Sequence, residues 1–334
     1  MQASGNCGIR SSSGSRGNSP RRCSNTKSQA MPDVNDSAMI LVSIGLPTYN
    51  RAEMLRKAIA SALAQSHRNI ELVISDNAST DETEAICREF AAADGRVRYI
   101  RQEKNLGPTP NFVAVLEAAD SEYFMWLCDD DWLDANYVEK CLAALLRDPE
   151  TILAGGVAKY YEGNVFKYDG AVTNLLQDDG FHRMLDYYDT IEDNGIYYGL
   201  WRRRELVHLP LDNTMGNDWL GLGAAAYVGK ICTVTGTFIH RDLGGSTVSF
   251  AAIVEQMELP AIQAHFPYVT IAVNAVQDIL LRVAVFRRLP LLRRLRMATR
   301  VFYLIFSRYV VRGAIVRFVV KAKALFRGSG ALSR

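Results

Sequence analysis

The sequence predicts an α/β fold in which a mostly parallel central sheet is covered by helices on both faces. Between residues 39 and 158, short apolar stretches of strand length alternate with segments whose apolar residues recur at helical spacing. Such alternation is typical of parallel sheets, because a helix must carry the chain back to the start of the next parallel strand. Two of the expected strands also end in acidic residues, at Asp76 and at Asp129-Asp130-Asp131.

Charge is distributed unevenly along the 334 residues, although the net charge is only +2. Residues 282–334 contain 14 Lys and Arg and no acidic residue, whereas residues 39–281 contain 19 basic and 34 acidic residues, a net charge of −15. An apolar content of 49% is enough for a sizeable core. This asymmetry indicates a basic docking surface attached to an acidic body that uses a metal ion.

Cysteine spacing and hydropathy bear on the compartment of the protein. The six cysteines, at positions 7, 23, 87, 128, 141 and 232, form no CxxC pair, which argues for free thiols in a reducing compartment and against a structural zinc site. No stretch of about 18 uncharged apolar residues occurs, and the N-terminus lacks the apolar core of a signal peptide. We therefore expect a cytoplasmic protein.

The first expected elements follow a polar leader. Residues 1–38 are rich in Ser, Gly, Asn and Arg and are expected to be disordered. A strand is expected at Ile40–Leu46, and Pro47-Thr48-Tyr49-Asn50 marks its end. The helix that follows has its apolar residues on one face: Met54, Leu55, Ala58, Ile59, Ala62 and Leu63.

The next strand is expected at Ile70–Ser75. Ser79 and Glu82 have the spacing of a capping box and predict the start of a helix. The elements that complete this part are a strand at Val97–Arg101, a turn at Asn105–Pro108 and a helix at Asn111–Ala119.

Residues Tyr123–Leu133 form the chemical centre of the sequence. Five largely apolar residues, Tyr123–Leu127, indicate a buried strand, and Asp129, Asp130 and Asp131 follow it. Three adjacent carboxylates repel one another unless a cation lies among them, so a hard metal ion that itself holds a phosphate is expected there. The alternative is a loop of solvated acids that caps the next helix.

Regular alternation continues and then loosens. The expected elements are a helix capped by Asp134, a strand at Ile152–Ala158, loops over Lys159–Thr214 with a short regular piece at Tyr197–Leu206, a helix at Asp218–Tyr227, a strand at Ile231–His240 and a Gly-rich turn at Asp242–Ser249. Loops as long as those after Lys159 usually form a binding site. From about Glu255 onward the sequence is helical and increasingly basic.

Five motifs at successive strand ends resemble those of an inverting glycosyltransferase of family 2 with the GT-A fold: PTYN at 47–50, DNASTD at 76–81, NLGP at 105–108, CDDDWL at 128–133 and NDW at 217–219. The resemblance covers roughly residues 40–250. It implies a nucleotide-sugar donor, a divalent metal (Mn²⁺ or Mg²⁺) and a glycan acceptor. The domains expected are the leader at 1–38, a GT-A catalytic domain at 39–250 with a nucleotide-binding half (39–158) and an acceptor/sugar half (159–250), and a basic amphipathic helical tail at 251–334.

The resemblance also assigns roles around the donor. Pro47, Tyr49 and Asp76 would line the base pocket, where the carboxylate can accept from a uracil or guanine N–H group. Their structural alternatives are a turn proline, a packed tyrosine and a helix-capping aspartate.

Within the acidic triplet, the resemblance makes Asp130 the principal metal ligand. Asp129 would lie near the ribose, and Asp131 would be a neighbouring ligand or a helix cap. Many relatives have a further acid at position 128, where this chain has Cys128. All three aspartates therefore stay candidates.

Three later residues complete the implied site. Asp218 would be the catalytic base that removes the proton of the acceptor hydroxyl, and burial would raise its pKa toward that role. Its alternative role is a helix N-cap. His240 would bind the metal and Arg241 the diphosphate, unless His240 is a structural residue at a strand end.

The basic tail suggests where the protein works. Six Arg residues between Arg293 and Arg312 fall on one broad helical face opposite apolar residues, as in helices that lie in a membrane interface. Such a tail would place the protein peripherally on the inner face of the membrane, attracted by anionic lipid. A helical subdomain packed on the catalytic body is one alternative, and a nucleic-acid patch, which we do not expect, is the other.

Taken together, the residues predict a metal-dependent inverting glycosyltransferase acting on a saccharide, expected to be lipid-linked, in surface polysaccharide synthesis. The alternative from another class is a catalytically silent nucleotide-sugar-binding scaffold at the membrane. A dinucleotide-binding oxidoreductase would share the α/β architecture. However, the first strand is followed by PTYN rather than a GxGxxG turn.

Overall fold

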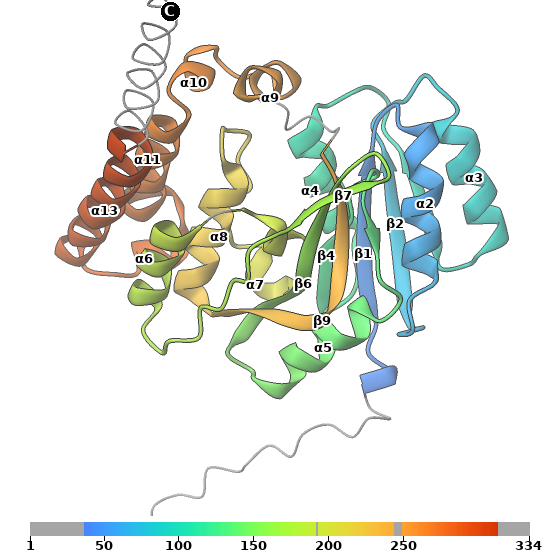
Figure 1. The fold of residues 1–334 in the computed structure, drawn as a ribbon, viewed down its shortest axis with the longest axis horizontal. Coiled ribbons are helices and arrows are strands. Elements are labelled where there is room, and N and C mark those ends of the chain that lie inside the picture. Colours follow the sequence, from blue (N-terminus) through green and yellow to red (C-terminus); the bar gives the residue numbers. More distant parts are fainter. Residues whose placement is uncertain (1–36, 192, 244–248, 313–334) are drawn as a thin grey trace, which may run out of the picture. The chain divides into compact units, whose positions relative to one another are not determined.

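The computed structural model describes residues 37–191, 193–243 and 249–312. Most of the expected leader, part of the Gly-rich turn and the end of the basic tail lie outside the described residues. Within them, one nine-stranded sheet has the order β3-β2-β1-β4-β8-β6-β9-β5, with β7 paired to β6 (Figure 1). The strands are β1 Val42–Thr48, β2 Ile70–Asp76, β3 Val97–Arg101, β4 Tyr123–Trp126, β5 Trp132–Leu133, β6 Thr151–Glu162, β7 Val165–Asp169, β8 Leu200–Arg202 and β9 Lys230–Asp242.

The first half of the sheet is parallel. Strand β1 pairs in parallel with β2 and β4, and β2 pairs in parallel with β3. Every residue of β1 is buried, as expected for a central parallel strand covered on both faces. Because Thr48 lies opposite Asp76 in the register, β1 and β2 end side by side, and β4 ends beside them. The polar residues that follow these strands therefore share one edge of the sheet.

Two apolar clusters occupy the two faces of the sheet. Val42, Ile44 and Leu46 of β1 face the helices α2 (Ala52–Leu63), α3 (Thr83–Ala93) and α5 (Tyr137–Arg147). On the other face, residues such as Phe124 and Trp126 of β4 pack with α4 (Pro108–Ala118), α6 (Gly180–Thr190) and α8 (Asn217–Val228). Helices on both faces confirm the α/β architecture that the sequence predicts.

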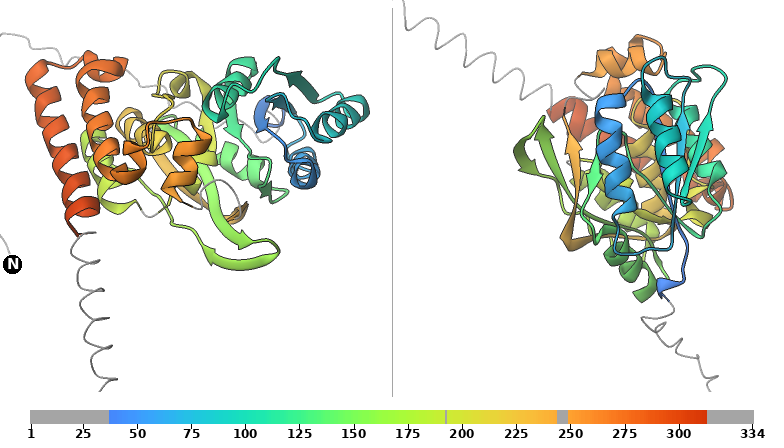
Figure 2. Two further views of the ribbon diagram at one scale, coloured as in Figure 1. Left: turned by 90° about the horizontal axis from the view of Figure 1, so that it is seen from above. Right: turned by 90° about the vertical axis from the view of Figure 1, so that its right-hand side faces the viewer.

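Among the described residues after β9, the chain is mostly helical, as expected. This part comprises α9 (Phe250–Gln256), α10 (Ile262–His265), α11 (Pro267–Gln277), the π-helical turn η3 (Asp278–Arg282), α12 (Ala284–Arg287), α13 (Leu291–Ile305) and the π-helical turn η4 (Phe306–Val311). Helices α11 and α13 lie side by side (Figure 2). Met297, Val301 and Ile305 of α13 are buried in the same cluster as α6 and α8. The described part of the tail therefore packs against α6 and α8. Such packing on the catalytic body is one of the alternatives to a membrane role that the sequence leaves open.

The expected membrane role of this helical region stays a prediction. On the outer side of α13, Leu291, Leu292 and Leu295 are exposed beside exposed Arg293 and Arg296. Among the described residues, no helix combines the length and the apolar character needed to cross a membrane.

Two local expectations are wrong. Helix α3 begins at Thr83, where Asp81 accepts a hydrogen bond from the Thr83 N–H, and the Ser79 hydroxyl instead accepts from the Asn50 N–H. Asp134 does not cap α5, which follows Asn136. Its carboxylate accepts from the Phe238 N–H of β9 instead. In both cases the polar side chain accepts a hydrogen bond from a backbone N–H that is distant in sequence, and does not cap the helix next to it.

The segment after Lys159 is more regular than the sequence suggests. It contains β7, α6, the 3-10 turn η1 (Gly195–Tyr198), β8 and the short helix α7 (Arg203–Leu206). Helix α6 buries Met184, Tyr187 and Tyr188 against the body, so its aromatic content reflects packing rather than an irregular loop. This segment places Asn194 and Tyr198 beside the site described next.

Candidate active site

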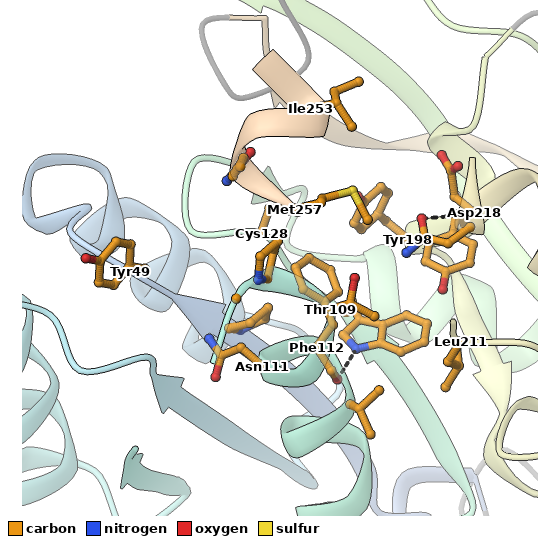
Figure 3. Close-up of a pocket in the computed structure, with 18 of the residues that line it drawn as sticks. Tyr49, Thr109, Asn111, Phe112, Cys128, Tyr198, Leu211, Asp218, Ile253 and Met257 are labelled. Atoms are coloured by element: carbon orange, nitrogen blue, oxygen red, sulfur yellow. Dashed lines mark hydrogen bonds between the residues drawn. The ribbon is translucent and has the colours of Figure 1, made fainter. Parts of the chain in front are cut away.

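A pocket of about 600 Å³ lies at the edge of the sheet where β1, β2 and β4 end. One wall comes from the turns after these strands and includes Tyr49, Cys128, Asp129 and Asp130. The opposite wall comes from α8, α9 and α11 and includes Asp218 (Figure 3). The pocket therefore joins the first half of the chain to the segments that follow β8.

Hydrogen bonds of Asn77 hold together the part of the pocket lining that follows β2. The Asn77 amide donates to Asn105 Oδ1 at 2.8 Å and to the Gly107 carbonyl at 3.0 Å, while its oxygen accepts from the Leu106 N–H. Gly107 has φ +84°, a left-handed conformation that favours glycine at this turn. Asn77, Asn105 and Gly107 all line the pocket. The NLGP motif thus shapes the site through its backbone turn.

Pro47 and Tyr49 line the pocket, and Tyr49 is 42% exposed. Asp76 does not line it. Its buried carboxylate accepts from the Tyr99 hydroxyl at 2.9 Å, the Arg101 guanidinium at 2.6 Å and the Ser79 N–H at 2.8 Å. The structure therefore uses Asp76 to tie β2 to β3 and to the following turn. A contact between Asp76 and a base stays a prediction.

The three aspartates after β4 occupy different surroundings. Burial, together with the neighbouring Asp130, raises the pKa of Asp129 to about 7. Burial also raises the pKa of Asp131 to about 7, although the Arg241 guanidinium lies 3.1 Å from its Oδ2 atom. Burial raises the pKa of Asp130, and Arg51, at 4.0 Å, opposes that change. Desolvated carboxyl groups so close together favour the binding of a cation.

Cys128, Asp130 and Asp131 have side-chain atoms spaced so that they fit one divalent metal ion. The Cys128 sulfur and one carboxylate oxygen each of Asp130 and Asp131 lie within 4.8 Å of one another. Metal–oxygen and metal–sulfur bonds are about 2.0–2.6 Å long, so one ion can reach all three atoms. Asp129 is not part of this group. The donor set therefore fits a metal, with a sulfur atom where the sequence pattern leads one to expect carboxylates.

Asp218 lies in the first turn of α8 and faces the pocket (Figure 3). Its Oδ2 atom accepts from the Asn194 amide at 2.7 Å, and its Oδ1 atom accepts from the Trp219 N–H at 2.9 Å. The Tyr187 hydroxyl donates to Asn194 Oδ1, which turns the amide nitrogen toward Asp218. Burial raises the pKa of Asp218, as expected for a base.

His240 and Arg241 are neighbours on β9, so their side chains point to opposite faces. Arg241 lines the pocket, with its guanidinium 4.1 Å from the Tyr198 ring centre. His240 does not line the pocket, because its Nε2 atom lies 2.9 Å from Asp134 Oδ1 and its Nδ1 atom 3.0 Å from the Tyr161 hydroxyl. The structure thus brings Arg241, and not His240, to the acidic triplet.

The opposite wall, which includes Asp218, is otherwise largely apolar. Trp219, Phe250, Ile253, Met257 and Tyr268 line it. The rings of Trp219 and Tyr268 lie 6.0 Å apart. The sequence pattern predicted only the part of this wall on α8, through Asp218 and Trp219, and passed over α9 and α11, which carry no motif. It also passed over Arg51, whose neighbours Tyr49 and Asn50 signalled the turn, and Asn194, for which no local signal exists.

Comparisons with known proteins bear on this geometry. Residues 43–207 match the model of a family described as Glycosyl transferase family 2. Glycosyltransferase GlyA of Streptococcus pneumoniae is 29% identical over 177 residues, which cover 52% of this chain and 24% of that protein. An uncharacterized glycosyltransferase of Haemophilus influenzae is 35% identical over 130 residues, which cover 39% of this chain and 52% of that protein. The chain thus spans about a quarter to a half of the length of these relatives.

Solved structures extend the likeness to the fold. Residues 1–349 of S. aureus TarS align with a TM-score of 0.55 and 17% identity, over 82% of this chain and 74% of that one. The same TarS region in complex with UDP-GlcNAc aligns with a TM-score of 0.53 and 17% identity, over 80% and 73% of the two chains. This similarity confirms the fold class predicted from the sequence, a GT-A type with a mostly parallel central sheet.

Proposed function

Because the chain belongs to glycosyl transferase family 2, whose model its residues 43–207 match, we propose that it is a metal-dependent inverting glycosyltransferase. It moves a sugar from a nucleotide-sugar donor to a hydroxyl group of a saccharide acceptor. One observation carries this proposal: a single pocket contains both Asp129 and Asp130, which follow β4, and the separate carboxylate Asp218. Transfer with inversion needs these two kinds of group on opposite sides of one sugar.

The wall formed by β1 and β4 suits the donor. Asp130 and Asp131, with Cys128, would hold the divalent metal, which supplies positive charge for the departing nucleotide diphosphate. Arg51 and Arg241 line the same wall and add fixed positive charge. Pro47, Tyr49 and Asn77 lie where the chain leaves β1 and β2, a position open to the base and the ribose. Asp129 belongs to the same wall and would contact the ribose.

Asp218 is the proposed base. As the acceptor oxygen forms its bond to the anomeric carbon, the hydroxyl proton passes to the Asp218 carboxylate and the nucleotide diphosphate leaves from the opposite face. Asn194 and the Trp219 N–H each hold one oxygen of Asp218, so the carboxylate has a fixed orientation. The raised pKa makes it a stronger proton acceptor than an exposed aspartate.

The apolar wall suits a glycan acceptor. Trp219 and Tyr268 offer aromatic faces on which the C–H faces of a pyranose ring can pack. Exposed Arg287, Arg288, Arg293, Arg296 and Arg300 lie near exposed Leu291, Leu292 and Leu295 on α12, α13 and the residues between them. Such a mixed basic and aliphatic surface suits an anionic membrane. We therefore extend the proposal to a lipid-linked acceptor in surface polysaccharide synthesis, reached from the cytoplasmic face.

A donor screen tests the proposed activity. Purified full-length protein with Mn²⁺ is incubated with a panel of nucleotide sugars, and both thermal stabilisation and release of nucleotide diphosphate are measured. UDP-GlcNAc is the first probe, because a fold neighbour is solved with it. We expect stabilisation together with metal-dependent release for at least one donor. Stabilisation without release or transfer for every donor and acceptor would favour a silent nucleotide-sugar-binding scaffold.

A further inference from the structure

One donor atom of the proposed metal site is a sulfur. Cys128 follows β4 directly after Leu127 and is a free cysteine that lines the pocket. Its Sγ atom and carboxylate oxygens of Asp130 and Asp131 lie within 4.8 Å of one another. Two ligands on opposite sides of one ion are separated by about twice the metal–ligand distance, or about 4–5 Å. The three atoms are therefore spaced as ligands of a single ion.

The carboxylates of this group are not equally available. Asp131 Oδ2 already accepts from Arg241 Nε at 3.1 Å, which reduces the negative charge that Asp131 can offer to a metal. Asp130 is less engaged, since its ion pair with Arg51 is as long as 4.0 Å. Asp129 lies outside the group. A cation thus meets one largely available carboxylate, one shared carboxylate and one sulfur.

From this donor set we infer that Cys128 is a direct ligand of the catalytic cation and that the site prefers Mn²⁺, Co²⁺, Zn²⁺ or Cd²⁺ to Mg²⁺. The inference rests on the proposed function and deepens it by naming the class of cation. Mg²⁺ requires near-octahedral oxygen ligands, whereas the other four ions accept sulfur with increasing readiness toward Zn²⁺ and Cd²⁺. When the sulfur–metal bond forms, the thiol proton is released to solvent.

Cobalt provides a direct readout that does not depend on turnover. Thiolate coordination to Co²⁺ produces a sulfur-to-metal charge-transfer absorption in the near ultraviolet, which oxygen ligands do not produce. We expect this band when the full-length protein is titrated with Co²⁺. It should be absent in Cys128→Ser and unchanged in Cys232→Ser, which alters a partly buried cysteine of β9 outside the pocket.

Affinities measured by calorimetry provide the second readout. Cys128→Ser should weaken Cd²⁺ binding by about 10-fold or more, at least the loss seen when a supporting contact of a metal site is removed. Cys128→Asp should shift the ratio of Mg²⁺ to Cd²⁺ affinity toward Mg²⁺ by a similar factor. Circular dichroism shows whether each variant is folded, and Cys128→Ala replaces the serine variant if that one does not fold.

The outcomes separate this inference from the proposed function. If Asp130→Ala weakens cation binding while Cys128→Ser leaves the cobalt band and the Cd²⁺ affinity unchanged, the metal site stands and the sulfur ligand is refuted. If neither substitution changes cation binding, the metal site itself is wrong. Loss of the band and weaker Cd²⁺ binding in Cys128→Ser, together with donor turnover by the wild-type protein in Mn²⁺, would support both.

Discussion

The two walls of the pocket are built in different ways. The wall that we propose for the donor, here called the donor wall, consists of turns that follow neighbouring parallel strands. Its groups include charged residues such as Arg51, Asp129 and Asp130. The wall that we propose for the acceptor, here called the acceptor wall, consists of residues from α8, α9 and α11 and of Met257. Apart from Asp218, the groups that face the site there are mostly apolar or aromatic. If the proposed function holds, the donor wall would perform chemistry shared with other family members, while the acceptor wall would determine what this chain modifies.

The largest effect is expected at Asp218, the carboxylate of the acceptor wall that we propose as the catalytic base. Asp218→Asn removes the proton acceptor but keeps the shape of the side chain. Transfer should fall by about 10²–10⁴-fold, the usual contribution of a general base. Thermal stabilisation by the nucleotide diphosphate should remain, because the donor wall is intact. Asp120→Asn, at an acid whose side chain is 77% exposed, is the matched control. Equal activity of the two variants would refute the base assignment.

A comparable loss of activity is expected for Asp130 of the donor wall, but with a different effect on nucleotide diphosphate binding. Asp130→Ala removes the least engaged carboxylate of the metal group. We expect loss of cation-dependent turnover and a cation affinity lower by about 10–100-fold or more. Here, unlike in Asp218→Asn, stabilisation by nucleotide diphosphate plus Mn²⁺ should also disappear. If nucleotide diphosphate plus Mn²⁺ still stabilised the Asp130 variant, the assignment of cation and donor binding to the donor wall would be wrong.

The sequence predicted the donor wall better than the acceptor wall, for a physical reason. Adjacent parallel strands end at one edge of a sheet, so PTYN, NLGP and CDDDWL could be placed together from strand order alone. Two candidates on this side, Asp76 and His240, do not line the pocket, and their polar atoms bond to partners from other strands, so their assigned roles stay predictions. Which of several available groups a carboxylate or imidazole will choose depends on packing, which no motif records.

Apart from Asp218 and the NDW motif on α8, the acceptor wall could not be predicted, because helices that are far apart in sequence build it. Helix α9 contributes Phe250 and Ile253, and α11 contributes Tyr268, yet neither helix has a pattern beyond an apolar face. Asn194, which orients Asp218, is a single amide 24 residues before it. The position of Asp218 at a helix start was visible in the sequence, but its partner was not.

A smaller effect should appear where the acceptor wall only binds. Trp219→Ala removes an aromatic face of the pocket that packs beside Tyr268 and Tyr309. We expect the KM for the acceptor to rise by about 10-fold, which corresponds to about 1.4 kcal/mol, the upper range for one aromatic contact. The KM for the donor should not change. A rise in the donor KM alone would mean that this wall belongs to the donor, and would reverse the comparison.

The last effect concerns stability rather than activity, and it extends the comparison to the helices behind the acceptor wall. Asp278, at the start of η3, is 3% exposed, and neither of its carboxylate oxygens has a hydrogen-bond partner. Burial raises its pKa to about 6 from the ordinary value of 3.8, while Arg282, whose Nη1 atom is 3.6 Å from Oδ1, opposes that change. The proposed cation would balance the negative charge of the acids on the donor wall, whereas Arg282 is the positive group beside the carboxylate of Asp278.

The sign of the pH dependence follows from this raised pKa. Between about pH 4 and pH 6 the folded protein holds a proton on Asp278 that the unfolded chain has released, so folding stability falls as the pH rises through this range. Asp278→Asn should flatten that part of the curve and stabilise the protein at pH 7 by up to about 2–3 kcal/mol. Chemical denaturation at pH 4.5, 6 and 7.5 measures it, with Asp189→Asn on the outer side of α6 as control. A variant less stable than the wild type at pH 7.5 would mean that Asp278 is paired after all, and that the helices behind the acceptor wall contain a compensated charge as the donor wall does.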